Sequence, residues 1–293
     1  MVYGRELQGL LVVVTIRYFS PAPALRGLIS SYYWFETSRP LLRDQMRAEL
    51  GQVRFMLDGR MRCRFDNGRQ VECPKAMLIG PTASTVATEA NGPFRLFGAG
   101  LMPAGWSMLI GEPADLLADN VVDLRGVTDR SADHALEALA SATSDVGRIV
   151  AADRFFLQLA TRARPVPLWF THMADEWLVA SADPQIDALV AATGMSNRQV
   201  ERWTKRYYGA SPKLMARKYR TLQAAVRLGN GDAASWTDAA GDAFYDQSHF
   251  IREFKQFVGT TPARFVADAA PVSRLTIARR RMMPDLPKLA LYS

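Results

Sequence analysis

Apolar and polar positions follow two different periods along this chain, and the period changes near residue 112. Before that point, short segments alternate apolar and polar side chains or are continuously apolar, as half-buried and buried strands do. Asp58-Gly59 and Asp66-Asn67-Gly68 favour hairpin turns, and Pro74 stops a strand. Strands are therefore predicted over residues 52–57, 60–65, 70–73, 76–79, 84–88 and 94–101. Such close spacing is typical of a small barrel or sandwich.

After residue 112, apolar positions recur at helical spacing. Helices are predicted over residues 112–120, 132–142, 146–162 and 170–180, with continuous helical pattern from residue 184 onward. The Pro-rich segment at residues 164–167 predicts a linker. We therefore predict an α+β fold: a β-rich domain with a helical appendage over residues 1–165, and an all-α domain over residues 166–293. The helices of residues 129–162 have two alternatives, packing on the β-rich domain or forming a dimer seam.

Two stretches of the all-α part have the pattern helix, tight turn, helix. In the first, Gly194 stands where a left-handed residue ends one helix, and Ser196 is a natural N-cap for the next. Val200 and Trp203 then face inward. The polar residues on the outward face are Arg198, Glu201 and Arg202.

The second stretch begins its last helix at Asp246, a good N-cap residue. Phe250, Phe254 and Phe257 share one face of that helix by their spacing. The other face carries donors and acceptors suited to base edges in a major groove, namely Gln247, Ser248, His249 and Arg252. His249 has an alternative role as a packing or capping residue.

These residues resemble the AraC/XylS family of transcription regulators over about residues 184–266. The match is carried by the run from Asp246 to Phe250 and by Arg252, Phe254, Lys255, Gly259, Thr261, Pro262 and Phe265. A fainter earlier copy ends in Gly209-Ala210-Ser211-Pro212. The resemblance implies two recognition helices in successive major grooves, joined by a helix over about residues 212–228.

Residue roles follow from that resemblance, position by position. It implies base contacts by Arg198, Glu201 and Arg202 in the first unit and by Gln247, Ser248, His249 and Arg252 in the second. It implies phosphate contacts, which position the protein without reading sequence, by Lys205, Arg206, Lys213 and Lys255. A solvated helix face is the alternative for each of these side chains.

Many members of the family carry an N-terminal cupin-like β domain that binds a small effector or mediates dimerisation, and residues 15–125 are compatible with one. The segment at residues 97–106 resembles the sensor portion of a branch of the family. Inward aromatic and arginine side chains are the candidates for an effector pocket: Trp34, Arg54, Phe55, Arg64 and Trp106. The alternative for each aromatic residue is a place in the core, and the alternative for each arginine is an outward-facing position.

Charge agrees with a nucleic-acid partner for the C-terminal third. The chain has a formal net charge of +7, and residues 194–293 hold 17 Lys and Arg against 8 Asp and Glu, whereas residues 1–193 hold 19 against 21. Such asymmetry fits an anionic polymer, although an anionic lipid surface would also attract it. The basic tail with Arg279-Arg280-Arg281 has two alternatives, an ordered cap or a loose extension that adds non-specific DNA affinity.

The chain lacks the residues that define several other classes of protein. Cys63 and Cys73, the two cysteines, make no disulfide scaffold and are interpreted as small core residues. The three histidines, His134, His172 and His249, lie outside the β-rich segment, which argues against a catalytic metal. No phosphate loop, nucleophile elbow or membrane-spanning run occurs. We expect no cofactor, no enzymatic activity and a cytoplasmic location.

The sequence therefore predicts a transcription regulator that binds promoter DNA. Its further expected partners are a small-molecule effector, a second copy in a homodimer, and RNA polymerase if the protein is an activator; no membrane partner is expected. Two alternatives stay open. One is a ligand-independent DNA-binding protein whose N-terminal domain only assembles, and the other is a DNA-targeted enzyme. An enclosed cavity with a few convergent polar groups would favour a sensor.

Overall fold

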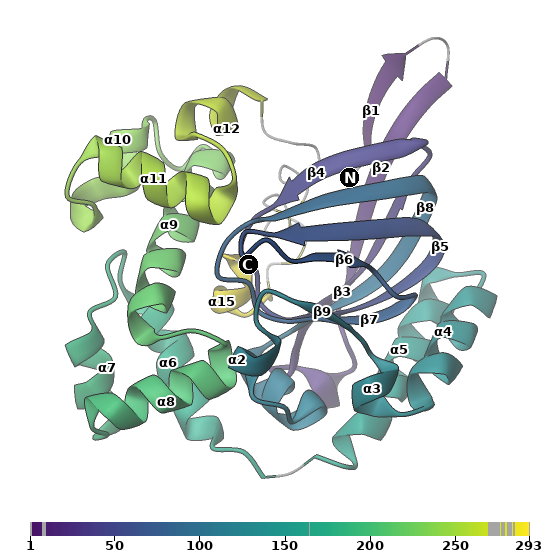
Figure 1. The fold of residues 1–293 in the computed structure, drawn as a ribbon, viewed down its shortest axis with the longest axis horizontal. Helices are drawn as coiled ribbons and strands as arrows, with labels where there is room; N and C mark the ends of the chain where they lie inside the picture. The colour runs from purple at the N-terminus through teal and green to yellow at the C-terminus, as the bar shows by residue number, and fades with distance from the viewer. Residues whose placement is uncertain are drawn as a thin grey trace.

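The N-terminal half is built on one antiparallel sheet of nine strands (Figure 1). The computed structural model of the 293-residue chain describes residues 2–7, 10–163, 165–268, 276, 279, 283 and 285–292. The strands are β1 (Val2–Leu7), β2 (Leu10–Phe19), β3 (Ile29–Thr37), β4 (Leu41–Met46), β5 (Gln52–Phe65), β6 (Gln70–Glu72), β7 (Ala76–Ile79), β8 (Val86–Leu101) and β9 (Val121–Asp123). Their order is β1-β2-β3-β8-β5-β7-β9, with β4 on β8 and β6 on β5.

The predicted hairpin at Asp58-Gly59 is wrong, because β5 runs straight through it. The register of β5 against β8 shifts on both sides of Asp58, so the Asp-Gly pair makes a bulge. Gly59 has a φ of +79°, and a Cβ there would lie 2.5 Å from the carbonyl oxygen of Asn91. The residue therefore serves a close backbone approach inside a strand, whereas the second turn, at residues 66–68, does join β5 to β6.

The two strands predicted over residues 84–88 and 94–101 form one strand, β8, which crosses Gly92-Pro93. Pro93 is tolerated because the partner changes there: β4 pairs with β8 as far as Asn91, and β3 takes over at Phe94. The helix predicted over residues 112–120 is also wrong. Only α2 (Ala114–Leu117) is helical, and the chain then enters β9 after Asp119, whose φ is +50°.

Helices cover one face of the sheet. Short elements lie between the strands, namely η1 (Pro23–Leu25), α1 (Pro103–Gly105) and η2 (Trp106–Ile110), and α3 (Arg125–Thr128) follows the last strand. The pair α4 (Ser131–Ser141) and α5 (Asp145–Ala160) then packs on the sheet through Leu139, Phe155 and Phe156. The stacked rings of Tyr32 and Phe156, 5.9 Å apart, are part of this layer. Packing on the β-rich domain is thus the arrangement found for the helices of residues 129–162.

The C-terminal part is a chain of helices arranged around α9 (Figure 1). They are α6 (Leu168–Ala180), α7 (Ile186–Thr193), α8 (Asn197–Tyr208), α9 (Pro212–Asn230), α10 (Trp236–Ala240), η3 (Gly241–Ala243), α11 (Gln247–Val258), α12 (Pro262–Asp268) and α15 (Lys288–Leu291). The first half of α9 contributes Met215 and Tyr219 to a core with α6–α8. Its second half contributes Leu222 and Leu228 to a core with α10–α12. One helix therefore belongs to both cores.

Candidate DNA-binding surface and effector cavity

The first helix-turn-helix unit forms for local reasons that the sequence makes visible. Gly194 ends α7 with a φ of +64°, and Ser196 caps α8. Gln199 completes a capping box, in which its side chain accepts a bond from the Ser196 backbone N–H and its own N–H donates to the Ser196 hydroxyl. The turn and the start of α8 are thus set within a few residues.

Two faces of α8 differ as predicted. Val200, Thr204, Tyr207 and Tyr208 are buried, whereas the exposed side chains include Arg198, Glu201, Arg202, Lys205 and Arg206. Trp203 is half-buried, with its ring 5.1 Å from that of Phe170 on α6. Lys205 forms an ion pair with Glu201 one turn earlier, at 2.8 Å. Glu201 and Lys205 therefore share a charge pair before any ligand arrives.

The second unit is built on the predicted phenylalanine face. Asp246 caps α11 by accepting a bond from the His249 backbone N–H at 2.7 Å. Phe250, Phe254 and Phe257 are fully buried. The opposite face of the helix holds the exposed residues Gln247, Ser248, Arg252 and Lys255.

His249 differs from its exposed neighbours, because it is half-buried and its side chain lies along α11 towards Glu253. Its Nε2 lies 3.5 Å from Oε1 of Glu253, and its ring lies against that of Phe244 with centroids 5.8 Å apart. The residue thus has packing contacts of the kind that the sequence left open, and only part of its ring faces outward.

Glu253 is the residue that sequence reasoning missed in this region. It is 3% exposed, and its carboxylate lies 2.7 Å from Nη2 of Arg217 and 3.7 Å from Nη2 of Arg220, both on α9. Arg220 also pairs with Asp183, at 2.9 Å, just before α7. This network connects α7, α9 and α11, and so fixes one unit relative to the other.

A second missed residue, Lys218, joins α9 to the β-rich domain. Its Nζ donates to the carbonyl oxygen of Glu49 at 2.8 Å and to that of Thr82 at 2.9 Å. The side chain is 5% exposed, and burial lowers the pKa of Lys218 to about 8. A signal was present: Lys218 stands at an inward position of α9, three residues after Met215 and four before Leu222.

The second unit touches the same two loops of the β-rich domain. The backbone N–H of Ala48 donates to the carbonyl of Phe257 at 2.8 Å, and that of Thr85 donates to the carbonyl of Gln256 at 3.1 Å. Residues 47–51 and 80–85, which we call the docking loops, therefore contact both units. Leu50 extends this contact into the core of α6–α9.

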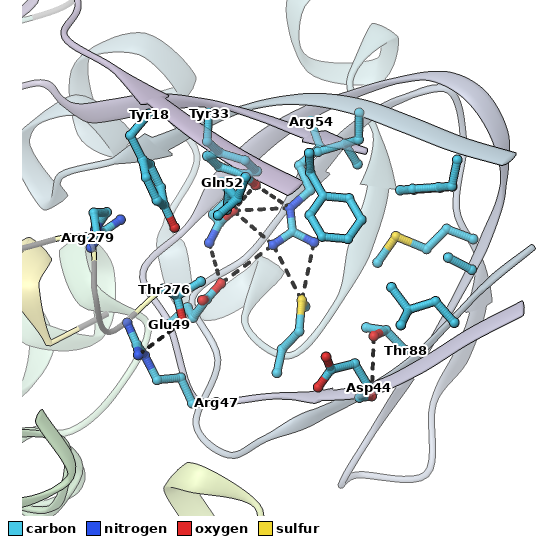
Figure 2. A pocket seen from close by; sticks show the side chains of 18 residues that line it. Tyr18, Tyr33, Asp44, Arg47, Glu49, Gln52, Arg54, Thr88, Thr276 and Arg279 are labelled. Carbon is cyan, nitrogen blue, oxygen red and sulfur yellow. Dashed lines mark hydrogen bonds and ion pairs between the residues drawn. The ribbon is translucent and has the colours of Figure 1, made fainter. Parts of the chain in front are cut away.

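One of the docking loops also borders a cavity on the inner face of the curved sheet (Figure 2). The cavity has a volume of about 90 Å³ and is open at its mouth. Its inner wall is mainly apolar and includes Ile16, Phe35, Leu42, Met61, Phe94 and Leu96. Several of its polar side chains gather at one end, as Figure 2 shows for Tyr33, Glu49, Gln52 and Arg54, whereas Asp44 and Thr88 lie apart from them. An apolar chamber with a few convergent polar groups is the usual form of a small-molecule site.

Arg54 organises the polar end. Its Nε donates to the Tyr33 hydroxyl at 2.7 Å, its Nη2 donates to Oε1 of Gln52 at 2.9 Å, and Nη2 lies 3.5 Å from the Glu49 carboxylate. Burial raises the pKa of Tyr33, so this hydroxyl stays protonated and can donate to the amide oxygen of Gln52. The side chains at this end are thus linked to one another before a ligand binds.

Residues beyond the second unit complete the mouth of the cavity. Arg47 donates from Nη1 to the Thr276 hydroxyl at 3.4 Å, and the guanidinium of Arg279 lies over the Tyr18 ring, 5.6 Å from its centroid. Arg279 is buried and also donates to the carbonyl of Ala290. Arg279 therefore belongs to an ordered cap, the first of the two alternatives given for the basic tail. Arg280 and Arg281 lie outside the described residues.

Of the five predicted pocket residues, the structure places one, Arg54, in the cavity wall. Trp34, Phe55 and Trp106 are wrong as wall residues, because they belong to the core on the other face of the sheet. Side chains alternate along β5, so Gln52 and Arg54 face the cavity while Val53 and Phe55 face α5. Arg64 is also wrong: the bulge at Gly59 shifts the alternation and leaves Arg64 exposed.

Within the described part of the chain, no three His, Cys, Asp or Glu side chains are grouped so that they could hold a metal ion. Likewise, none of the described helices is long and apolar enough to cross a membrane.

Two segments of the chain match described protein families. Residues 189–268 match a family described as a helix-turn-helix domain, and residues 17–123 match a domain of unknown function, DUF6597. No curated protein matches. The matched helix-turn-helix domain indicates a DNA-binding transcription regulator. The matched helix-turn-helix domain agrees with the resemblance of residues 184–266 to the AraC/XylS regulators.

Solved structures of regulators resemble the whole chain only loosely. A single-residue variant of ToxT from Vibrio cholerae without ligand is 6% identical, covers 88% of this chain and 98% of its own, and has a TM-score of 0.47. ToxT from Vibrio cholerae with an unsaturated fatty acid bound is 9% identical, covers 87% and 94%, and has a TM-score of 0.45. The AraC-like activator CuxR is 14% identical, covers 77% and 87%, and has a TM-score of 0.32. These likenesses carry no inference about ligands or DNA sites.

Proposed function

We propose that this regulator reads a bipartite DNA site by placing α8 and α11 in successive major grooves. The observation that carries the proposal is that both helices bury one face and expose a polar face, while a single helix, α9, belongs to the cores of both units. The 19 residues of α9 span roughly 28 Å at ~1.5 Å per residue. That length approaches the ~34 Å between grooves one turn apart, and DNA bending can supply the difference.

Roles within the two helices follow from exposure. One half of the site would be read from α8 by Arg198, Glu201 and Arg202. The other half would be read from α11 by Gln247, Ser248 and Arg252, with His249 at the edge of this second set. Lys213 and Lys255 are exposed and would hold phosphates, as would Arg206. For Lys205 we propose the same role, although its ion pair with Glu201 must then open or be shared.

The division of labour is the second part of the proposal. Residues 1–165 would form the sensor and residues 166–293 the DNA-binding domain. The cavity favours a sensor over a domain that only assembles, because its polar end includes the residues next to the docking loop contacted by α9. We propose a small amphipathic effector, with its apolar part against the inner wall and its polar part at Arg54, Gln52 and Tyr33. Homodimer formation and, if the protein is an activator, a contact with RNA polymerase are proposed on the family resemblance alone.

Selection of genomic DNA fragments by the full-length protein, followed by sequencing at about physiological salt, tests the DNA proposal. The expected result is an enriched motif of two half-blocks separated by one helical turn, about 10 base pairs. Enrichment of a single block would contradict two-groove reading. Binding without any motif, lost as salt is raised, would reduce the proposal to non-specific attraction by the basic third.

Replacement of Arg252 by alanine is expected to lower affinity for the selected site by about 5-fold to 150-fold and to relax the base preference at one position, as loss of a base contact of ~1–3 kcal/mol does. The matched control is Lys255→Ala on the same helix, which should weaken all sequences alike and reduce the slope of log affinity against log salt by about 0.9. Competition binding at several salt concentrations measures both. An Arg252→Ala protein with unchanged base preference would remove Arg252 from the reading set.

The cavity can be tested before its effector is known. An amphipathic fluorescent probe, anilinonaphthalene sulfonate, is expected to bind the native protein and brighten in the apolar chamber. Ala90 lines the cavity and is 6% exposed, so Ala90→Phe should fill the space and remove most of the signal. The melting temperature of the variant serves as the control for folding. Equal brightening of a folded Ala90→Phe protein would place the probe elsewhere and contradict the sensor proposal.

A further inference from the structure

The two cysteines of the chain meet inside the β-rich domain. Cys63 lies on β5, and Cys73 follows β6; the Cys73 thiol donates to the Cys63 sulfur at an Sγ–Sγ distance of 3.4 Å. They are 0% and 8% exposed, respectively, and both are free thiols. A disulfide has an Sγ–Sγ distance of about 2.05 Å, so a bond between them requires a small approach of two side chains on adjoining strands.

The surroundings give the two thiols different chemistry. The hydrogen bond from Cys73 and the positive charge of Arg54 lower the pKa of Cys63, and burial opposes them. The same hydrogen bond, together with burial, raises the pKa of Cys73, which holds the proton. Thiolate character therefore concentrates on the Cys63 sulfur, and the thiolate is the nucleophilic form.

Access to the pair depends on β6, one of the two shortest strands of the sheet. β6 has three residues and, among the described strands, pairs with β5 alone. Its two end residues, Gln70 and Glu72, are exposed. A short edge strand of this kind opens locally at low free-energy cost, and such an opening would admit a molecule near the size of water. It would not readily admit a bulky disulfide.

We propose that Cys63 and Cys73 are a reversible oxidation site that closes to a disulfide when hydrogen peroxide enters. The Cys63 thiolate attacks one peroxide oxygen, the O–O bond breaks, and hydroxide leaves, so that Cys63 becomes a sulfenic acid. The Cys73 sulfur then attacks the Cys63 sulfur, the S–O bond breaks, and the hydroxyl leaves as water with the Cys73 proton. In sum, two thiols lose two electrons, one peroxide is reduced to two waters, and β5 is tied to β6.

Thiol counting on the full-length protein tests this site without any variant. The protein is exposed to peroxide, quenched, unfolded in the presence of iodoacetamide, and weighed by intact mass spectrometry. Untreated protein should take two alkyl groups, treated protein none, and treated protein reduced with dithiothreitol two again. Trypsin cuts after Arg64 and Arg69, between the two cysteines, so the bond should leave two joined peptides. Two alkyl groups after treatment, or sulfinic acids without joined peptides, would overturn the proposal.

A comparison of rates in native and unfolded protein tests whether the fold assists formation of the disulfide. Once Cys63 is a sulfenic acid, native protein is expected to close the bond at least about 10-fold faster than the urea-unfolded chain, because the fold holds the two sulfurs together. Equal rates would mean that the arrangement contributes nothing. Single variants assign the roles: dimedone should label Cys63 in Cys73→Ser after peroxide, whereas Cys73 in Cys63→Ser should stay largely unlabelled. The reverse labelling pattern would overturn the assignment of Cys63 as the attacking thiol.

Discussion

Replacing Phe254 by alanine should remove one half of the DNA footprint and leave the other. Phe254 is fully buried, with its ring 5.4 Å from Phe250 and 5.4 Å from Phe265. Truncating such a side chain costs ~3–5 kcal/mol, which is comparable with the stability of a small helical unit. The second unit should therefore unfold locally, with a loss of affinity for the full site of at least about 100-fold. Footprinting on the selected DNA and native-state hydrogen exchange measure the two effects.

The matched control is Phe170→Ala, in the core of the first unit. Phe170 is equally buried and packs against Trp203 and Tyr207 of α8. It should remove the opposite half of the footprint while sparing the α11 half. If each variant instead loses both halves, the two units do not read DNA separately; if Phe254→Ala keeps both halves, α11 is not a reading helix.

The two units were predictable because their determinants are local. A left-handed glycine, a capping serine or aspartate and an apolar face at helical spacing all lie within some twenty residues of one another. Gly194, Ser196 and Asp246 have the predicted roles, and the linking helix extends two residues beyond the predicted end, to Asn230. Local chemistry of this kind does not depend on how the rest of the chain folds.

The sheet was harder, because a strand is defined by partners far away in sequence. Asp58-Gly59 has the composition of a hairpin turn, but β8 pairs with β5 on both sides of it and turns it into a bulge. That bulge in turn changes which face Arg64 occupies. The pocket prediction failed for Trp34, Phe55 and Trp106 for the same reason: an inward aromatic can face either layer, and only the pairing of strands decides which.

The contacts that connect distant parts of the chain could not be predicted, because the sequence shows at most that a charged side chain is buried and not what it contacts. Glu253 contacts Arg217 across 36 residues, and Lys218 contacts Glu49 across 169. A buried charge is tolerated only where such a partner exists, and one sequence does not name the partner. Lys218 is where the α9 helix, the docking loops and the polar end of the cavity come together, since Glu49 accepts from Lys218 with its backbone and pairs with Arg54 through its carboxylate.

Lys218→Ala is expected to destabilise the full-length protein by about 3 kcal/mol, the second large effect. The substitution leaves the carbonyl oxygen of Thr82 without this donor and leaves that of Glu49 with the Thr82 N–H alone, and an unsatisfied buried acceptor costs ~1–3 kcal/mol. Urea unfolding near neutral pH measures the change. Lys213→Ala, on the exposed face of the same helix, is the control and should change stability little. An unfolding midpoint equal to that of the wild type would mean that α9 does not depend on this contact.

The same variant should also change how stability depends on pH. Lysine in an unfolded chain keeps its proton up to its ordinary pKa of 10.5, whereas burial makes folded Lys218 release it at a pKa of about 8. Between these values the unfolded state binds more protons, so the contribution of Lys218 to folding stability rises with pH. From about pH 7.5 to about pH 9.5 the wild type should gain about 2 kcal/mol relative to Lys218→Ala. The difference between the two proteins cancels titration of the other groups, and a difference that stays constant with pH would contradict burial of this amine.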